Sequence, residues 1–333
     1  MKALVVGLGS MGKRRVRNLL HLNTIQVAGF DVREDRRNES FIKYGIQTFD
    51  NFATACNLHQ PDVLIISTPP DLHMQYAYAA LDMGIHCFIE ASVVHADKIK
   101  ELYALSKARN ILMAPSCTMR YFSGPKTIKS MLNEGLIGKV IAWNYHTGQR
   151  LEEWHPWESI SDFYVSKRET GGAREIVPFE LTWLNDLFGE PKVLSGFKSK
   201  VSNMSADIDD IYQFTFLYPE KVFATMTVEV ISRIKAARYL RIIGEKGQII
   251  FDGDENSVRY VNDQQTEWKI TKFNQGTIEK QYINPEEPYI NEMKDFITAV
   301  ESGDFSHFPN TLLEDWKILE LLNQVERRAL AWA

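Results

Sequence analysis

The residues best suited to chemistry in this sequence begin with a glycine-rich turn. Gly7, Gly9 and Gly12 fit the pattern G-x-G-x-x-G, which here follows an apolar run and opens an amphipathic stretch. In such a turn the first glycine permits a tight bend, the second lets the backbone approach a pyrophosphate, and the third lets the helix pack on the strand. The backbone N–H groups of Ser10 and Met11, at the start of that helix, would attract phosphate. The turn therefore predicts a bound dinucleotide.

A carboxylate and three arginines bear on which dinucleotide that is. Asp31 lies nineteen residues after Gly12, at the end of the second apolar run. An acidic side chain at that position accepts a hydrogen bond from the ribose 2′-OH and repels a 2′-phosphate, which favours NAD. Arg33, Arg36 and Arg37 follow closely and offer partners for a 2′-phosphate. NAD is therefore the predicted cofactor, and NADP is the alternative.

The elements that must position this turn alternate in type along the first third of the chain. Short apolar runs without polar alternation are typical of strands covered on both faces, and the amphipathic stretches between them are typical of helices. The alternation predicts an α/β domain with a doubly wound parallel sheet. The predicted strands are 3–6, 27–30, 63–66, 87–89 and 111–114, and the predicted helices include 71–83 and 96–109.

The remainder of the chain has longer strands with fewer helices between them, which predicts an antiparallel sheet. In the run 211–218, aromatic side chains alternate with a mixed set that includes Ile211 and Leu217, so both faces have reason to be covered. We therefore expect helices on one face and a second copy of the chain on the other, as a homodimer or homotetramer. The predicted strands are 140–149, 192–201, 211–218, 222–231, 239–244 and 248–252, and the last helices are 289–300 and 312–329.

Composition restricts the class of protein. The 333 residues carry a net charge of −5 and are 44% hydrophobic, so no basic field recruits nucleic acid or an anionic membrane. No apolar run approaches the ~20 residues that span a bilayer, and because the first apolar run ends at Gly7 we expect no signal peptide. Cys56, Cys87 and Cys117 lack the spacing of a disulfide framework or a zinc site. We expect a cytoplasmic protein without a metal site, divided into domains 1–122 and 123–333.

A series of motifs follows in order along essentially the whole chain: Gly7–Gly12, Ser67-Thr68-Pro69 with His73, Glu90, Met119–Phe122, Glu134–Val140, Gly171-Gly172 and Ile243–Gly247. In this order they resemble the Gfo/Idh/MocA family, which includes glucose–fructose oxidoreductase and inositol 2-dehydrogenase. The resemblance implies an N-terminal Rossmann domain and a C-terminal α/β domain with a large, mostly antiparallel, open-faced sheet. It also implies that the cofactor contacts include Ser67, Thr68, Pro69, His73, Glu90 and Ala91.

Two departures from the family pattern concern proton transfer. Family members usually carry Glu-Lys-Pro where this chain has Glu90-Ala91-Ser92, and Ala91 can neither donate, accept nor carry charge. After the glycine pair the family usually places an Asp and, about four residues on, a His, whereas here Phe179 or Glu180 takes the place of that histidine. The family's usual proton-transfer residues therefore have no direct equivalents in this chain.

Hydride transfer at an alcohol carbon needs a group that takes the hydroxyl proton. Glu180 and Glu175 are the nearest titratable candidates after the glycine pair, and a partly dry site raises the pKa of a carboxyl toward that of a useful base. The alternative is that one of them only binds sugar hydroxyls or pairs with Arg174. His155 lies between two tryptophans and is a further acid/base candidate; the alternative is a histidine packed among aromatic rings.

Cations gather in the same part of the chain, and they include Arg120, Lys167 and Arg168. Because arginine prefers planar carboxylate or phosphate partners, these residues are candidates for binding an anionic substrate such as a sugar acid or a nucleotide-linked sugar. The alternative is salt bridging to nearby glutamates. Tyr164 is a candidate for stacking on a sugar ring, or for packing alone.

Together these features predict an NAD(P)-dependent oxidoreductase that transfers hydride between nicotinamide and a secondary alcohol or ketone of a sugar, sugar acid or nucleotide-sugar. One alternative is an enzyme that oxidises its substrate only transiently, to enable elimination or glycoside cleavage, as some members of the family do. A second is a catalytically silent protein that senses NAD or a sugar, because the usual lysine and histidine are missing.

Overall fold

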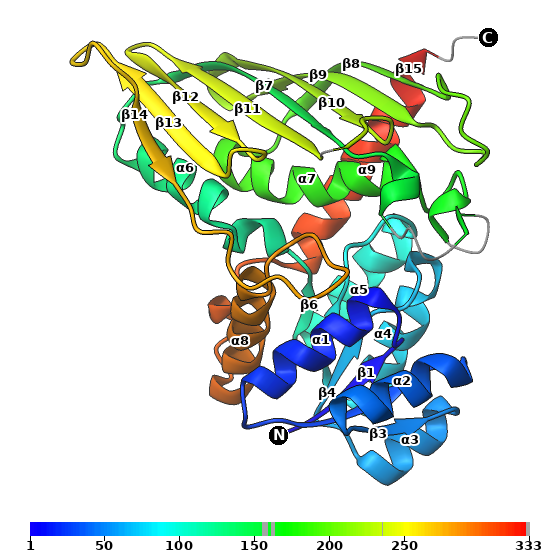
Figure 1. Ribbon diagram of the computed structural model, residues 1–333. Helices are drawn as coiled ribbons and strands as arrows, with labels where there is room; N and C mark the ends of the chain where they lie inside the picture. Colours follow the sequence, from blue (N-terminus) through cyan, green and yellow to red (C-terminus); the bar gives the residue numbers. More distant parts are fainter. Residues whose placement is uncertain (155–158, 161–163, 235, 331–333) are drawn as a thin grey trace. The chain divides into compact units, whose positions relative to one another are not determined.

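The computed structural model describes residues 1–154, 159–160, 164–234 and 236–330, which form two compact units (Figure 1). The first unit consists of Met1–Thr118 and Gly276–Lys317, and the second of Met119–Gln275 and Ile318–Ala333. Each unit has a sheet of its own.

The sheet of the first unit is parallel and six-stranded. Its strands are β1 (Lys2–Val6), β2 (Gln26–Phe30), β3 (Gln47–Phe49), β4 (Val63–Ile66), β5 (His86–Ile89) and β6 (Met113–Pro115). Their order, β3-β2-β1-β4-β5-β6, confirms the predicted doubly wound fold. Val5, Leu64 and Phe88 are fully buried, as expected for strands covered on both faces. In such a sheet ligands bind beyond the carboxyl ends of the strands, where the strand order reverses, which here is between β1 and β4.

The first unit contains six complete α-helices, of which α1–α5 connect these strands and α8 comes from later in the chain. They are α1 (Ser10–His21), α2 (Glu34–Tyr44), α3 (Phe52–His59), α4 (His73–Met83), α5 (Ala96–Ala108) and α8 (Glu287–Ser302). The predicted helices 71–83 and 96–109 correspond to α4 and α5. Over the part of the chain that the structure describes, none of the helices combines the length and the apolar composition needed to cross a bilayer.

A buried network of charges ties α8 to the rest of the first unit. Glu292 is fully buried, accepts hydrogen bonds from the Cys117 N–H and the Thr118 hydroxyl at 2.6 Å each, and places its Oε2 2.9 Å from Arg15 Nη1. Arg15, also fully buried, donates to both oxygens of Glu90 at 2.6 and 3.0 Å. Burial disfavours the charged guanidinium, but Glu90 and Glu292 outweigh it and raise the pKa of Arg15 above its ordinary value.

The division into domains 1–122 and 123–333 stays a prediction. The compact units of the structure group one long segment differently. Gly276–Lys317 follows β14 of the second sheet in sequence but joins the first unit. Ion pairs explain this return, because Glu286 accepts hydrogen bonds from Arg14 at 3.1 Å and from Arg17 at 2.9 Å, both on α1. The pattern of apolar residues along the sequence gives no sign of such pairs.

The sheet of the second unit is nine-stranded and mostly antiparallel, as predicted. Its strands are β7 (Val140–Gly148), β8 (Lys192–Ser199), β9 (Ile211–Tyr218), β10 (Val222–Glu229), β11 (Ala237–Gly244), β12 (Gly247–Asp252), β13 (Ser257–Asn262), β14 (Lys269–Lys272) and β15 (Ala329–Leu330). The order is β14-β13-β12-β11-β7-β10-β9-β8-β15, in which β7–β10 and β8–β15 are parallel pairs. The predicted strands correspond to β7–β12. The sequence did not indicate β14, whose residues are all exposed.

One face of this sheet is covered by α6 (Ser123–Asn133), α7 (Ala173–Phe188) and α9 (Leu312–Arg328) (Figure 1). The aromatic residues of β9 lie on this face and are buried, and the Tyr218 hydroxyl donates to Asn185 of α7 at 2.9 Å. The opposite face carries side chains such as Phe223 of β10, which is 55% exposed. Among the described residues no helix covers that face (Figure 1).

The buried network around Glu292 predicts a large effect of Glu292→Gln on stability. Either orientation of the amide turns its NH₂ toward a fixed donor, the Arg15 guanidinium or the Cys117 N–H. We expect the free energy of unfolding to fall by about 3 kcal/mol, measured by urea unfolding followed by circular dichroism. Glu301→Gln, an exposed position on the same helix, is the control and should change it by less than about 0.5 kcal/mol. Equal urea midpoints for the two variants would contradict the expectation.

Candidate active site

The glycine turn joins β1 to α1 and leaves no room for a side chain at two of its positions. Gly7 has a φ of +91°, and a Cβ on it would lie 2.7 Å from the carbonyl oxygen of Ser67. A Cβ on Gly12 would lie 1.8 Å from the carbonyl oxygen of Gly7. Only glycine therefore fits at these two positions, as expected where a helix starts directly against its strand.

The first turn of α1 carries no compensating charge. Gly9 is the N-cap residue and has no side chain with which to cap the helix, and the first turn contains no acidic residue. The backbone N–H groups at Ser10 and Met11 therefore keep the positive potential of a helix N-terminus, which attracts phosphate.

Asp31 follows β2 and lies beside this turn. Its Oδ2 accepts the Leu8 N–H and its Oδ1 accepts the Arg33 N–H, both at 2.8 Å. The Arg36 guanidinium lies 3.7 Å from Oδ2, whereas Arg33 pairs with the exposed Asp35 at 2.6 Å. The structure thus brings together the predicted acid, the glycine turn and one arginine.

The loop after β4 packs against the same turn. It contains Ser67, Thr68 and Pro69 and leads to His73 at the start of α4. The His73 ring is buried, and its Nε2 lies 2.8 Å from the Thr68 carbonyl oxygen. Burial lowers the pKa of His73, which keeps the ring neutral. Thr68 Oγ1 is buried without a hydrogen-bond partner among the described residues, so it is available to a bound group.

The loop after β5 holds the residues that replace the family's Glu-Lys-Pro. Both oxygens of Glu90 are engaged by Arg15, and Ser67 Oγ lies 3.4 Å from Oε1. The methyl group of Ala91 adds no donor or charge here. Ser92 Oγ and Oδ2 of Asp315 are both buried. Burial raises the pKa of Asp315 to about 7, although a hydrogen bond from Ser92 works in the opposite direction.

These features of the first unit fit a dinucleotide. The tight turn at Gly7 and Gly12 suits a pyrophosphate lying on its backbone, the uncapped start of α1 supplies N–H donors, and Asp31 would face the ribose. The residues that would hold it are those of the turn, Asp31 and the loop after β4.

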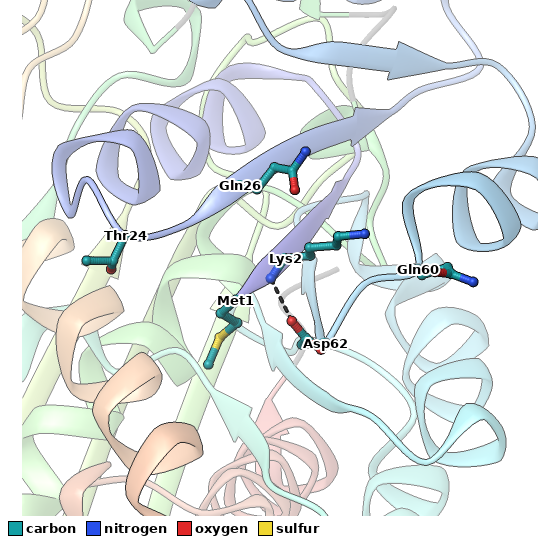
Figure 2. Close-up of a pocket in the computed structure, with 6 residues that line it drawn as sticks. All are labelled: Met1, Lys2, Thr24, Gln26, Gln60 and Asp62. Atoms are coloured by element: carbon teal, nitrogen blue, oxygen red, sulfur yellow. Dashed lines mark hydrogen bonds between the residues drawn. The ribbon is translucent and has the colours of Figure 1, made fainter.

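A surface hollow lies at the opposite, amino-terminal ends of β1 and β2 (Figure 2). Met1, Lys2, Thr24, Gln26, Gln60 and Asp62 line it, and the Lys2 N–H donates to Asp62 at 2.7 Å. Because doubly wound sheets bind ligands at the carboxyl ends of their strands, we assign no function to this hollow.

Glu175 lies in the first turn of α7, in the second unit, and is only partly exposed. Its Oε1 accepts the Tyr164 hydroxyl at 2.5 Å, and its Oε2 is buried without a hydrogen-bond partner among the described residues. Burial raises the pKa of Glu175 to about 7, although the Tyr164 hydrogen bond works in the opposite direction. An unpaired carboxylate oxygen with such a pKa is suited to exchanging a proton near neutral pH.

Glu180, on the same helix, has a different environment. Five residues at about 100° each turn its side chain roughly 140° from that of Glu175, toward the sheet. It is fully buried and accepts hydrogen bonds from Tyr145 at 2.6 Å, Trp183 at 2.7 Å and Arg238 at 2.6 Å. This geometry favours a structural role, and the catalytic role expected from the sequence stays a prediction.

The predicted substrate-binding cations are mostly engaged in ion pairs. Arg168 donates to Asp207 and Asp209 at 2.6 Å each. Arg174 donates to Glu326 at 2.7 Å, and Arg120 Nη1 lies 3.8 Å from Asp186. Lys167 is exposed. These pairs offset much of the positive charge that an anionic substrate would use.

One predicted site residue has not yet been placed, and several charged residues around the site were not predicted. His155 lies outside the described residues. The sequence did not indicate Arg15, which pairs with both Glu90 and Glu292, or Arg238, which pairs with Glu180. A signal for Glu292 did exist, because it falls on the same helical face as the apolar Tyr289, Met293 and Phe296.

Solved structures with a similar fold cover nearly the whole chain. An oxidoreductase from Agrobacterium radiobacter in complex with NAD+, L-tartaric acid and magnesium gives a TM-score of 0.85 at 12% identity, covering 99% of this chain and 96% of that one. Levoglucosan dehydrogenase with NADH and levoglucosan gives 0.83 at 16% identity, covering 99% and 97%. The myo-inositol 2-dehydrogenase of Lactobacillus plantarum gives 0.80 at 19% identity, covering 99% and 97%. At these identities the similarity establishes a shared fold.

Curated relatives match over a shorter region. The uncharacterized oxidoreductase YdgJ of Escherichia coli K12 is 26% identical over 198 residues, which are 57% of this chain and 53% of that protein. An uncharacterized oxidoreductase of Streptococcus pneumoniae is 26% identical over 200 residues, 57% of this chain and 52% of that protein. The matches thus span about half of these relatives.

Two family models account for most of the chain. Residues 1–115 match the oxidoreductase family with an NAD-binding Rossmann fold, and residues 126–250 match the GFO/IDH/MocA C-terminal domain. The glycine turn, Asp31 and the doubly wound sheet described above lie within the first match. This chain belongs to the Gfo/Idh/MocA family of NAD-binding oxidoreductases.

Proposed function

We propose that this chain is an NAD-dependent dehydrogenase that oxidises a secondary alcohol of a neutral sugar or polyol to the ketone, or catalyses the reverse reduction. The observation that carries the proposal is the environment of Glu175, in an oxidoreductase whose usual lysine and histidine are missing. The Oε2 of Glu175 is buried without a hydrogen-bond partner among the described residues, and burial raises the pKa of Glu175 to about 7. A base with that pKa is half-ionised near neutral pH and serves both directions of the reaction.

Glu175 is the proposed proton acceptor. As the alcohol is oxidised, its O–H proton passes to Oε2 while the C–H bond breaks and its hydride leaves the carbon. The nicotinamide, when bound, supplies the hydride acceptor. The Tyr164 hydroxyl donates to Oε1 at 2.5 Å and so fixes the orientation of the carboxylate, which leaves Oε2 as the oxygen that takes the proton. Arg174 pairs with Glu326 at 2.7 Å, and the causes of the raised pKa of Glu175 are its burial and, in the opposite direction, the Tyr164 hydrogen bond.

The ion pairs of the second unit favour a neutral substrate. The carboxylates of Asp207, Asp209 and Glu326 already neutralise Arg168 and Arg174. Among the structural neighbours, levoglucosan and inositol are neutral, whereas tartaric acid is anionic. A neutral, hydroxyl-rich ligand needs hydrogen bonds rather than a free guanidinium.

A cofactor-reduction assay tests the proposed reaction. The protein is incubated with NAD+ and matched pairs of neutral sugars and their acids, and the absorbance of reduced nicotinamide is followed. We expect net reduction with at least one neutral sugar or polyol and a lower kcat/KM for its acid. Substrate turnover without net reduction would instead support elimination or glycoside cleavage, and cofactor binding without turnover would support a sensor.

Glu175→Gln tests the assignment of the base. Because Gln cannot accept the proton, kcat should fall by about a hundredfold to ten-thousandfold. In the unmodified protein kcat for oxidation should rise with pH through about 7 as Glu175 ionises, and Tyr164→Phe should move that midpoint upward because a hydrogen bond to the carboxylate is lost. Glu169→Gln, an exposed control, should leave kcat within about twofold. An unchanged kcat in the Glu175 variant would exclude this residue as the base.

The same variant gives a second readout that needs no substrate. The folded-state pKa of Glu175, about 7, lies above its ordinary value of 4.5, so folding costs stability as pH rises between these values and the full cost remains above pH 7. Glu175→Gln should therefore equal the parent protein in stability near pH 4.5 and exceed it by about 1–3 kcal/mol at pH 8, measured by urea unfolding. A constant difference at both pH values would contradict the raised pKa.

The uncovered face of the nine-stranded sheet is the proposed contact with a second copy. Phe223 is 55% exposed there, in the middle of a broad face with polar partners such as the Asn144–Thr225 hydrogen bond of 2.6 Å. Light scattering should give the mass of a homodimer or homotetramer, and Phe223→Glu should lower it. Ile42→Glu is the control. Ile42 lies on α2 and is 81% exposed, so this substitution should leave the mass unchanged. A monomeric parent protein would remove this proposal.

A further inference from the structure

The carboxylate of Asp31, which normally excludes a 2′-phosphate, is largely engaged in this chain. The Leu8 N–H and the Arg33 N–H each donate to one of its oxygens at 2.8 Å. Its side chain is only 6% exposed. A carboxylate whose charge is spread over fixed backbone donors and a nearby cation repels a second anion less than an isolated carboxylate does.

That cation is Arg36, which reaches back from the first turn of α2. Its Nη1 lies 3.7 Å from Asp31 Oδ2 and 3.4 Å from the position a Cβ would take on Gly9. Gly9 is the glycine across which a dinucleotide backbone passes. The guanidinium therefore stands between the acid expected at the ribose and the turn expected at the phosphates.

The neighbouring arginines are placed differently. Arg33 pairs with Asp35 on the exposed side of α2 at 2.6 Å. Arg37 donates to the carbonyl oxygens of Asp31 and Val32 at 2.9 Å each, which fixes the end of β2 against the start of α2. The backbone that carries Arg36 is therefore held in place, and its guanidinium lies beside the glycine turn.

We propose that Arg36 is the specificity-determining residue that lets this chain bind NADP as well as NAD, by pairing with the 2′-phosphate. The inference rests on the dinucleotide site of the proposed function. A 2′-phosphate is attached to the ribose oxygen that Asp31 addresses, so a guanidinium 3.7 Å from that carboxylate is within reach of it. Arginine offers several donors in one plane to a phosphate, and it neutralises the Asp31 charge that would otherwise repel it.

Calorimetric titration of the full chain tests this assignment without an activity measurement. The probes are NAD+, NADP+ and the two fragments 5′-AMP and 2′,5′-ADP, which differ in the 2′-phosphate alone. We expect Arg36→Gln to weaken NADP+ and 2′,5′-ADP by about tenfold or more and to change NAD+ and 5′-AMP by less than about threefold. Lys43→Gln removes the same charge from the far end of α2 and should change all four by less than about twofold.

The outcomes of the titration distinguish the proposed role of Arg36 from the existence of the NAD site itself. If the parent protein binds NAD+ but neither NADP+ nor 2′,5′-ADP, the inference about Arg36 is overturned while the NAD site stands. An equal loss of NAD+ and NADP+ in the Arg36 variant, with an unchanged thermal midpoint, would make Arg36 a pyrophosphate contact and overturn its role in specificity. Failure of the parent protein to bind either dinucleotide would overturn the proposed function itself.

Discussion

The first unit of this structure depends on the close approach of the Gly12 backbone to the carbonyl oxygen of Gly7. A Cβ on Gly12 would lie 1.8 Å from that oxygen, so α1 starts directly against β1. The position of α1 then sets the charges that follow it. Arg15 points inward to Glu90 and Glu292, while Arg14 and Arg17 hold Glu286. One steric constraint thus places both the expected phosphate site and the charges that draw a distant segment into the first unit.

Glu175 and Glu180 both lie on α7, but their hydrogen-bond partners differ and suit the two carboxylates to different roles. Glu180 faces the sheet, where Tyr145, Trp183 and Arg238 saturate it. Glu175 faces away, has one donor and keeps one unpaired oxygen. A buried carboxylate with a cation and two further donors is a fixed part of the core, whereas one that is desolvated but incompletely paired holds a proton near neutral pH. The proposed chemistry follows from this difference in partners.

The first sheet and the order of its strands could be predicted because uninterrupted apolar runs and the glycine turn are local signals. The aromatic alternation of β9 also placed its buried face correctly. Pairings between charged residues far apart in sequence could not be predicted, since nothing local to Arg15 indicates Glu292. The same limit applies to the site: the sequence indicated both Glu175 and Glu180, but only their contacts separate a saturated carboxylate from a half-paired one.

The return of α8 to the first unit has a consequence for synthesis on the ribosome. Glu292 emerges 277 positions after Arg15, once β7–β14 of the second sheet have been made. Until then the nascent dinucleotide-binding unit carries a guanidinium with half of its carboxylate partners and an incomplete core. A chain truncated after β14 would therefore expose an unfinished surface, and such a fragment is a natural client for chaperones.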